Sequence, residues 1–189
     1  MHPIDIVLRP LGWAFSSRRA GETNSLANAP AFATTGRLTL TSPNFLEGEE
    51  IPAKHCGKFI GQNVSPALDW SALPDEASSL LLIVEDLDSP GTSPRLHAAA
   101  AFPATVERLT EGALTPDATD VQFLAGKRGP LTYAGPRPLP GHGPHHYRFH
   151  LYALDAQVDL ATIPAAEHLA PQLSGHVLAS GTLTGTRTA

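Results

Sequence analysis

The sequence predicts a mainly β protein, a β-sandwich of largely antiparallel strands with one or two short helices. Three observations lead to this prediction. Short runs with strand character recur along the chain, turn-forming residues separate them, and strands do not alternate with long helices. The chain has 18 prolines and 16 glycines among 189 residues, which suits many short strands joined by tight turns. This length fits one domain with an added segment.

The first 36 residues are expected to form an N-terminal arm attached to a domain over residues 37–189. Apolar residues at helical spacing predict a helix, although Pro10 disfavours it, and a polar linker follows. The helical stripe consists of Ile4, Val7, Leu8, Leu11 and Phe15. We expect the arm to pack on the domain or on a second subunit. A helix lying on a membrane surface is the alternative, because Arg9, Arg18 and Arg19 accompany the stripe.

The predicted strands follow in order from residue 37. Alternating or continuously apolar runs mark them: RLTLT (37–41), SLLLIVE (79–85), RLHAAAAF (95–102), VQFLA (121–125), HYRFHLYAL (146–154) and HVLASGTLTG (176–185). A single late helix is expected between Pro164 and Gly175, shortened by Pro171.

The composition of the chain disfavours several classes of protein, among them nucleic-acid-binding, disulfide-stabilised and membrane-spanning proteins. Hydrophobic residues make up 42% and charged residues 16%, with a net charge of −5, so nucleic-acid binding is not expected. Cys56 is the only cysteine, which excludes an internal disulfide and favours a reducing, cytoplasmic location. No export signal is recognised, and no apolar run is long enough to predict a membrane span.

Polar residues that could carry chemistry gather at three places. Asp86 and Asp88 follow the strand 79–85, and their spacing predicts two carboxylates on one side of the sheet. His97 begins an otherwise apolar strand. The stretch YAGPRPLPGHGPHHY (133–147) is a stiff loop with three histidines.

The order of these blocks resembles a known family. LTSPNF, GQNVSPALDW, IVEDLDSP, RLHAAAAFP, the loop above and GHVLASGTLTG are similar to the phosphatidylethanolamine-binding protein family, in particular to its bacterial branch, often called Raf kinase inhibitor-like. The resemblance covers roughly residues 38–186. It implies a pocket for an anion such as phosphate or a phospholipid head group, and bacterial relatives suggest a homodimer. Carried over residue by residue, the pocket contains Asp86, Asp88, Pro90, His97, Gly135, Pro136, His145 and Tyr147.

Three departures from the family pattern affect this expectation. Leu87 separates the two aspartates where the family has proline, and His146 replaces an arginine. Ala98 replaces a tryptophan after the pocket histidine, which predicts a wider pocket wall.

Elementary chemistry supports an anion site in the same place. Gly135 would let an anion approach backbone N–H groups, and the neighbouring prolines would reduce the entropy lost on binding. Nearby aspartates would raise the pKa of His97 and His145, so that charged donors face the ligand. The carboxylates could also orient the imidazoles or accept from a ligand ammonium or protonated phosphate.

We therefore expect a non-enzymatic binding protein without cofactor or metal. The alternative is an interaction protein that inhibits a kinase or a protease. A hydrolase with Asp86 and His145 as acid–base pair is less favoured, because no candidate nucleophile sits in a recognised elbow. The candidates are Ser65, Ser89 and Cys56. A zinc site at His142, His145 and His146 is disfavoured, because the segment lacks cysteine and cannot form the helix on which such pairs converge.

Overall fold

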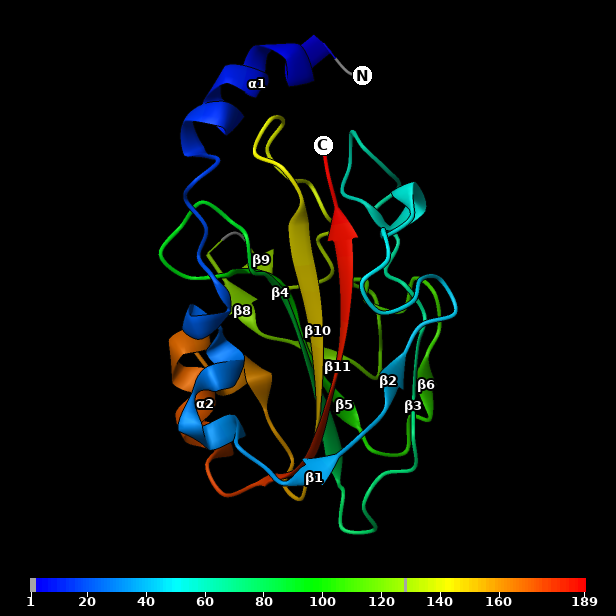
Figure 1. Cartoon of the computed structure of the whole chain (residues 1–189). Coiled ribbons are helices and arrows are strands. Elements are labelled where there is room, and N and C mark those ends of the chain that lie inside the picture. Colours follow the sequence, from blue (N-terminus) through cyan, green and yellow to red (C-terminus); the bar gives the residue numbers. More distant parts are fainter. Residues whose placement is uncertain (1–2, 128) are drawn as a thin grey trace.

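The computed structural model describes residues 3–127 and 129–189. Its main element is a six-stranded sheet, in which each neighbouring pair is antiparallel except the first (Figure 1). In spatial order the strands are β1 (Gly36–Arg37), β11 (Val177–Arg187), β10 (His145–Leu154), β4 (Ser79–Asp86), β5 (Arg95–Pro103) and β7 (Gln122–Phe123). The predicted mainly β class, dominated by antiparallel pairs, is confirmed.

A smaller sheet covers one face of the main sheet. It contains β2 (Leu40–Thr41), β3 (Leu68–Trp70) and β6 (Arg108–Leu109), and a two-residue pair, β8 (Ala125–Gly126) with β9 (Gly129–Pro130), lies apart from it. Aromatic contacts fill the space between the layers, with ring centroids 5.8 Å apart for Phe45 and Phe149. The larger of two hydrophobic clusters occupies this interior.

Helical turns and the N-terminal arm cover the opposite face. They comprise α2 (Leu169–Leu173) and the 3-10 turns η1 (Glu22–Asn24), η2 (Leu26–Asn28), η3 (Pro30–Phe32), η5 (Leu160–Thr162) and η6 (Ala166–His168). Figure 1 shows the arm and α2 side by side on this face. Phe32 of the arm packs on Tyr152 of β10 at a centroid distance of 4.8 Å. Because both faces are covered, β4 is buried throughout, as its apolar run predicts.

The arm is hydrogen-bonded to the end of β4 and the turn after it. Helix α1 (Pro3–Phe15) forms despite Pro10. Beyond it, the amide of Ala20 donates to the carbonyl of Ser89 (3.0 Å) and that of Gly21 to Leu87 (2.8 Å). Two further donors, the Ser25 hydroxyl and the Leu26 amide, reach the buried Glu85 carboxylate.

Three local predictions need correction. The stretch 37–41 is split between β1 and β2, because the chain crosses there from one sheet to the other. The stretch 121–125 is likewise divided between β7 and β8. The late helix begins with the turn η6 and has only five α-helical residues. No helix in the described part of the chain is long and apolar enough to cross a membrane.

Candidate functional site

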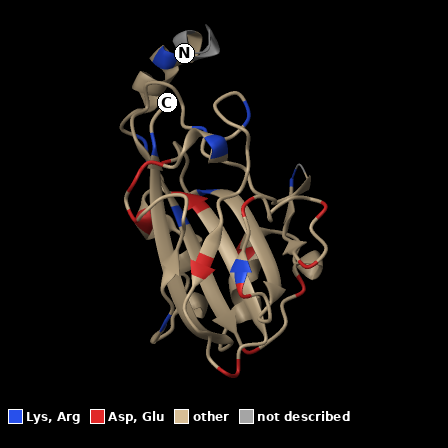
Figure 2. Cartoon of the chain, turned by 90° about the vertical axis from the view of Figure 1, so that its right-hand side faces the viewer, with Lys and Arg blue, Asp and Glu red and all other residues tan. Residues whose placement is uncertain are grey.

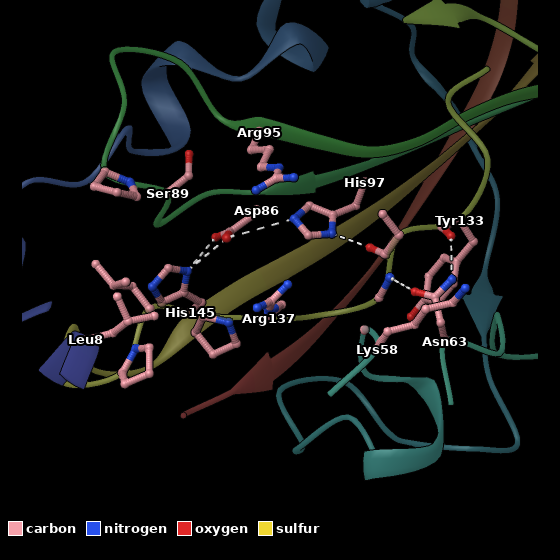
Figure 3. Close-up of a pocket in the computed structure, with 17 residues that line it drawn as sticks. Leu8, Lys58, Asn63, Asp86, Ser89, Arg95, His97, Tyr133, Arg137 and His145 are labelled. Atoms are coloured by element: carbon pink, nitrogen blue, oxygen red, sulfur yellow. Dashed lines mark hydrogen bonds and ion pairs between the residues drawn. The ribbon is translucent and has the colours of Figure 1, made fainter. Parts of the chain in front are cut away.

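A cavity of about 560 Å³ opens at the end of the sheet where β4 ends and β5 and β10 begin (Figure 3). Five chain segments supply its walls: α1 at Leu8, the loop 57–63, the end of β4 with the turn after it, the start of β5, and the loop 133–145. Five residues predicted for the site line this cavity, namely Asp86, Pro90, His97, Gly135 and His145. The topology brings them together because β4 pairs with both β5 and β10.

Three cations that the sequence reasoning missed also line the cavity. They are Lys58, Arg95 and Arg137, and none of them forms an ion pair with a carboxylate of the described residues. Arg95 could have been found, because it lies two positions before His97 and so shares its side of the strand. The other two lie on loops with no periodicity to reveal them.

His97 presents an unpaired nitrogen to the cavity. Its Nδ1 donates to the carbonyl of Ala134, and its buried Nε2 has no hydrogen-bond partner among the described residues. Burial lowers the pKa of His97 and outweighs the opposing effects of the Ala134 carbonyl and Asp86, so the ring is neutral and Nε2 is an acceptor. The expectation of a raised pKa at His97 is therefore wrong, because desolvation dominates.

Asp86, His145 and His142 form a continuous hydrogen-bonded array. His145 Nδ1 lies 2.8 and 3.0 Å from the two Asp86 oxygens. Its Nε2 lies 2.8 Å from Nδ1 of His142, whose Nε2 lies 3.0 Å from the carbonyl oxygen of Arg18. Both histidines are buried, so the array connects the cavity with the N-terminal arm.

The array leaves no ring nitrogen of His145 for a ligand. Its Nδ1 is engaged with Asp86 and its Nε2 with His142. His145 therefore lines the cavity without a free N–H for an anion.

Asp88 does not face the cavity, contrary to the prediction of two carboxylates on one side. Strand β4 ends at Asp86, so alternation no longer applies, and the Asp88 amide turns back to Asp86 Oδ1 (3.0 Å). Arg19 donates to Asp88 Oδ1 (2.5 Å), and the His146 amide donates to Oδ2 (2.7 Å). Burial disfavours the Asp88 charge, but hydrogen bonds from His146 and Arg19 hold its pKa below the ordinary value. Asp88 therefore attaches the arm.

Gly135 lines the cavity, but for a different reason from the one expected. A Cβ at this position would lie 2.1 Å from the His55 carbonyl oxygen, so the missing side chain allows two loops to touch. Its amide already donates to Asn63 Oδ1 (2.8 Å) and is not available to an anion. Pro136 lies behind the wall, where its carbonyl accepts from the Gly57 amide (2.9 Å).

Tyr147 lies beneath the cavity rather than in its lining. Its ring meets His97 edge-on (centroids 5.1 Å apart) and stacks with His145 (6.3 Å). Burial, and then the charge of Asp86, raise the pKa of Tyr147 far above its ordinary value, so its hydroxyl is a neutral donor. Ala98 is also part of the core and not of the cavity wall, so the predicted widening there is wrong.

Two further candidate residues, Ser89 and His146, make contacts that serve the structure. The Ser89 hydroxyl donates to the Ser93 carbonyl (3.3 Å). His146 points away from His145, as strand alternation predicts, and its Nδ1 lies 2.7 Å from Asp88. Among the described side chains, no three His, Cys, Asp or Glu residues are placed to hold a metal ion.

Comparison with known proteins relates this geometry to a family. The family model described as "Phosphatidylethanolamine-binding protein" matches residues 41–188, so the arm up to β1 lies outside the match. A UPF0098 protein of Pyrococcus horikoshii is 35% identical over 146 residues, covering 75% of this chain and 72% of its own length.

A relative and a solved structure extend the comparison. A Mycobacterium tuberculosis protein, provisionally named lipoprotein LppC, is 37% identical over 153 residues, covering 78% of this chain and 73% of its own length. The crystal structure of Escherichia coli YbcL, described as a member of the mammalian PEBP family, has a TM-score of 0.73 and 26% identity. It covers 82% of this chain and 99% of its own.

Proposed function

This chain belongs to the phosphatidylethanolamine-binding protein family, and we propose that its cavity binds a small phosphorylated ligand that carries a proton donor as well as negative charge. A partly protonated phosphate, a phosphate monoester and a phosphoethanolamine head group share this chemistry. The unpaired, buried Nε2 of His97 carries the proposal, because a buried acceptor is stable only when a donor reaches it.

The cavity offers both hydrogen-bond acceptors and cationic donors. The acceptors are His97 Nε2 and Asp86 Oδ2, 4.0 Å apart. The donors lie around them, with Arg95 beside Asp86 and His97 and with Arg137 and Lys58 across the cavity (Figure 3). A ligand that has both anionic oxygens and an O–H or N–H group satisfies the acceptors and the donors at once.

We further propose that the protein acts by binding alone, because the hydroxyl of the cavity serine, Ser89, donates to a backbone carbonyl and not to a base of the described residues. A cytoplasmic location and a homodimer complete the proposal. The first is supported by the single, unpaired Cys56.

Comparison of phosphate with sulfate tests the two acceptors of the cavity, His97 and Asp86. The two ions are similar in size, but at pH 7 only phosphate carries a proton. Calorimetric titration should show phosphate binding at least about fivefold more tightly than sulfate, since one unsatisfied buried acceptor costs roughly 1–3 kcal/mol. Equal affinities would disprove the role of His97 and Asp86, and no heat with phosphate or phosphoethanolamine would disprove the function.

Two variants with matched controls test a donor and an acceptor of the cavity separately. Arg137→Gln should weaken both anions, whereas Arg108→Gln, on β6, should weaken neither. Asp86→Asn should reduce the preference for phosphate over sulfate, and the exposed Asp117→Asn should preserve it.

A further inference from the structure

Helix α1 exposes large apolar side chains although it rests on the protein. Val7 and Leu11, one turn apart, are 75% and 46% exposed. Trp13, about 160° round the helix from Leu11, is 62% exposed, whereas Gly12 is buried. Apolar side chains of a helix normally pack against another element, and within the described chain these three remain exposed.

Close backbone contacts fix the orientation of α1. A Cβ at Gly12 would lie 1.9 Å from the Pro140 carbonyl oxygen, and one at Gly141 would lie 2.7 Å from that of Arg9. The helix thus rests directly on the loop that forms a wall of the cavity, and Leu8 itself lines the cavity. Rotating α1 to bury Val7 and Leu11 would break these contacts.

The loop around residue 59 places a second apolar group at this end. Figure 1 shows α1 and the loop after the turn η4 (Ala53–His55) at the same end of the molecule. Phe59 on this loop is 72% exposed, and the Arg137 guanidinium lies 4.8 Å from its ring centroid. Because Lys58 and Leu8 both line the cavity, apolar groups flank its opening on two sides.

We propose that this end of the protein docks on an anionic phospholipid bilayer, with α1 and Phe59 at the level of the head groups. The docking surface consists of Val7, Leu11, Trp13, Lys58, Phe59 and Arg137, with Arg9 at its border. Exposed tryptophan and apolar groups beside unpaired cations are the features that hold proteins at such an interface.

Charge selects a bilayer over a second copy of the chain. Lys58, Arg137 and Arg9 make no ion pair with a carboxylate of the described residues, and Figure 2 shows basic residues on α1 and on the loops near it. A twofold dimer through this surface would bring these cations toward their own copies. Anionic lipids neutralise them. Docking also places the cavity opening against the lipid phosphates, a consequence that rests on the proposed function.

Vesicle flotation of the full chain tests the docking surface. Vesicles of 30% phosphatidylglycerol in phosphatidylcholine should bind the protein, and pure phosphatidylcholine should bind it much more weakly, as each cation contributes about fivefold. The double variant Leu11→Ser and Trp13→Ser should lose at least about tenfold in vesicle affinity. Leu46→Ser, which removes a side chain that is 66% exposed but lies outside the surface, should lose none.

Phosphate titration separates this proposal from the previous one. The double variant should keep the phosphate affinity of the wild type, which also shows that it folds. If it floats like the wild type, or if it instead abolishes a dimer in solution, docking on a bilayer is refuted. Vesicle binding without phosphate binding would retain the docking surface and refute the proposed ligand.

Discussion

Replacing Gly135 with alanine separates two explanations of this glycine. If it exists for contact between loops, the new Cβ would sit 2.1 Å from the His55 carbonyl oxygen, about 1.3 Å closer than the 3.4 Å at which ordinary contacts begin, and 2.8 Å from the Gly57 nitrogen. Because both neighbours are backbone atoms, the loops must separate. If glycine serves only ligand approach, Gly135→Ala should keep its stability and lose phosphate binding.

The magnitude follows from the hydrogen bonds that join the loops. Separation would break the bonds from the Gly57 amide to Pro136 (2.9 Å) and from the Gly135 amide to Asn63 (2.8 Å). Each contributes about 1 kcal/mol, and a buried group left without a partner costs up to about 3 kcal/mol. We expect the free energy of unfolding to fall by about 2–5 kcal/mol.

Urea unfolding at pH 7 measures this loss, provided that the slope with denaturant is unchanged. Gly91→Ala is the matched control, because a Cβ there meets its nearest atom at 3.4 Å and its φ is not positive. A Gly135→Ala variant that unfolds at the wild-type urea concentration would refute the loop-contact explanation.

Three further predictions concern the attachment of the arm and the effect of pH. Arg19→Gln should lower the free energy of unfolding by about 1–3 kcal/mol, because a charged donor to Asp88 is lost; Arg18→Gln is the control, and equal urea midpoints for both would contradict the prediction. Glu85→Gln places an amide opposite the Ser25 and Leu26 donors, so limited proteolysis should cleave the arm faster; an unchanged rate would count against the attachment. The pKa values of Asp88 and Glu85 are lowered in the folded state, so the unfolded chain binds more protons in acid and urea midpoints should fall as the pH drops through about 4; a flat profile would show that these carboxylates do not stabilise the fold.

Much of the fold can be read from the sequence, because local pattern decides it. The runs that became β4 and β5 are buried by layers on both faces of the sheet, and a continuous apolar run is the signature of such strands. The run that became β10 was recognised by its alternation instead. The break within 37–41 has no such signature. Alternation looks the same whichever sheet a residue joins, so the crossing between sheets is decided by tertiary contacts.

Strand register determines part of the predicted site, whereas Pro90 and Gly135 of the cavity lining came from the resemblance to the family. Asp86, His97 and His145 meet because their strands pair side by side. Asp88 was misplaced because the end of a strand cannot be located to a single residue from sequence. His142 was considered only as a zinc ligand, because its contacts with His145 in the same loop and with the Arg18 carbonyl 124 positions away depend on how the loop and the arm fold.

The attachment of the arm also bears on where the protein can be cut. Removing everything before β1 would leave each strand of the main sheet intact. It would also strip Glu85 of the Ser25 and Leu26 donors and Asp88 of Arg19, leaving buried carboxylates without those donors. A fragment trimmed to the family match, which begins at residue 41, would therefore be expected to lose solubility or yield, even though it lacks only the two-residue strand β1 of the six strands in the main sheet.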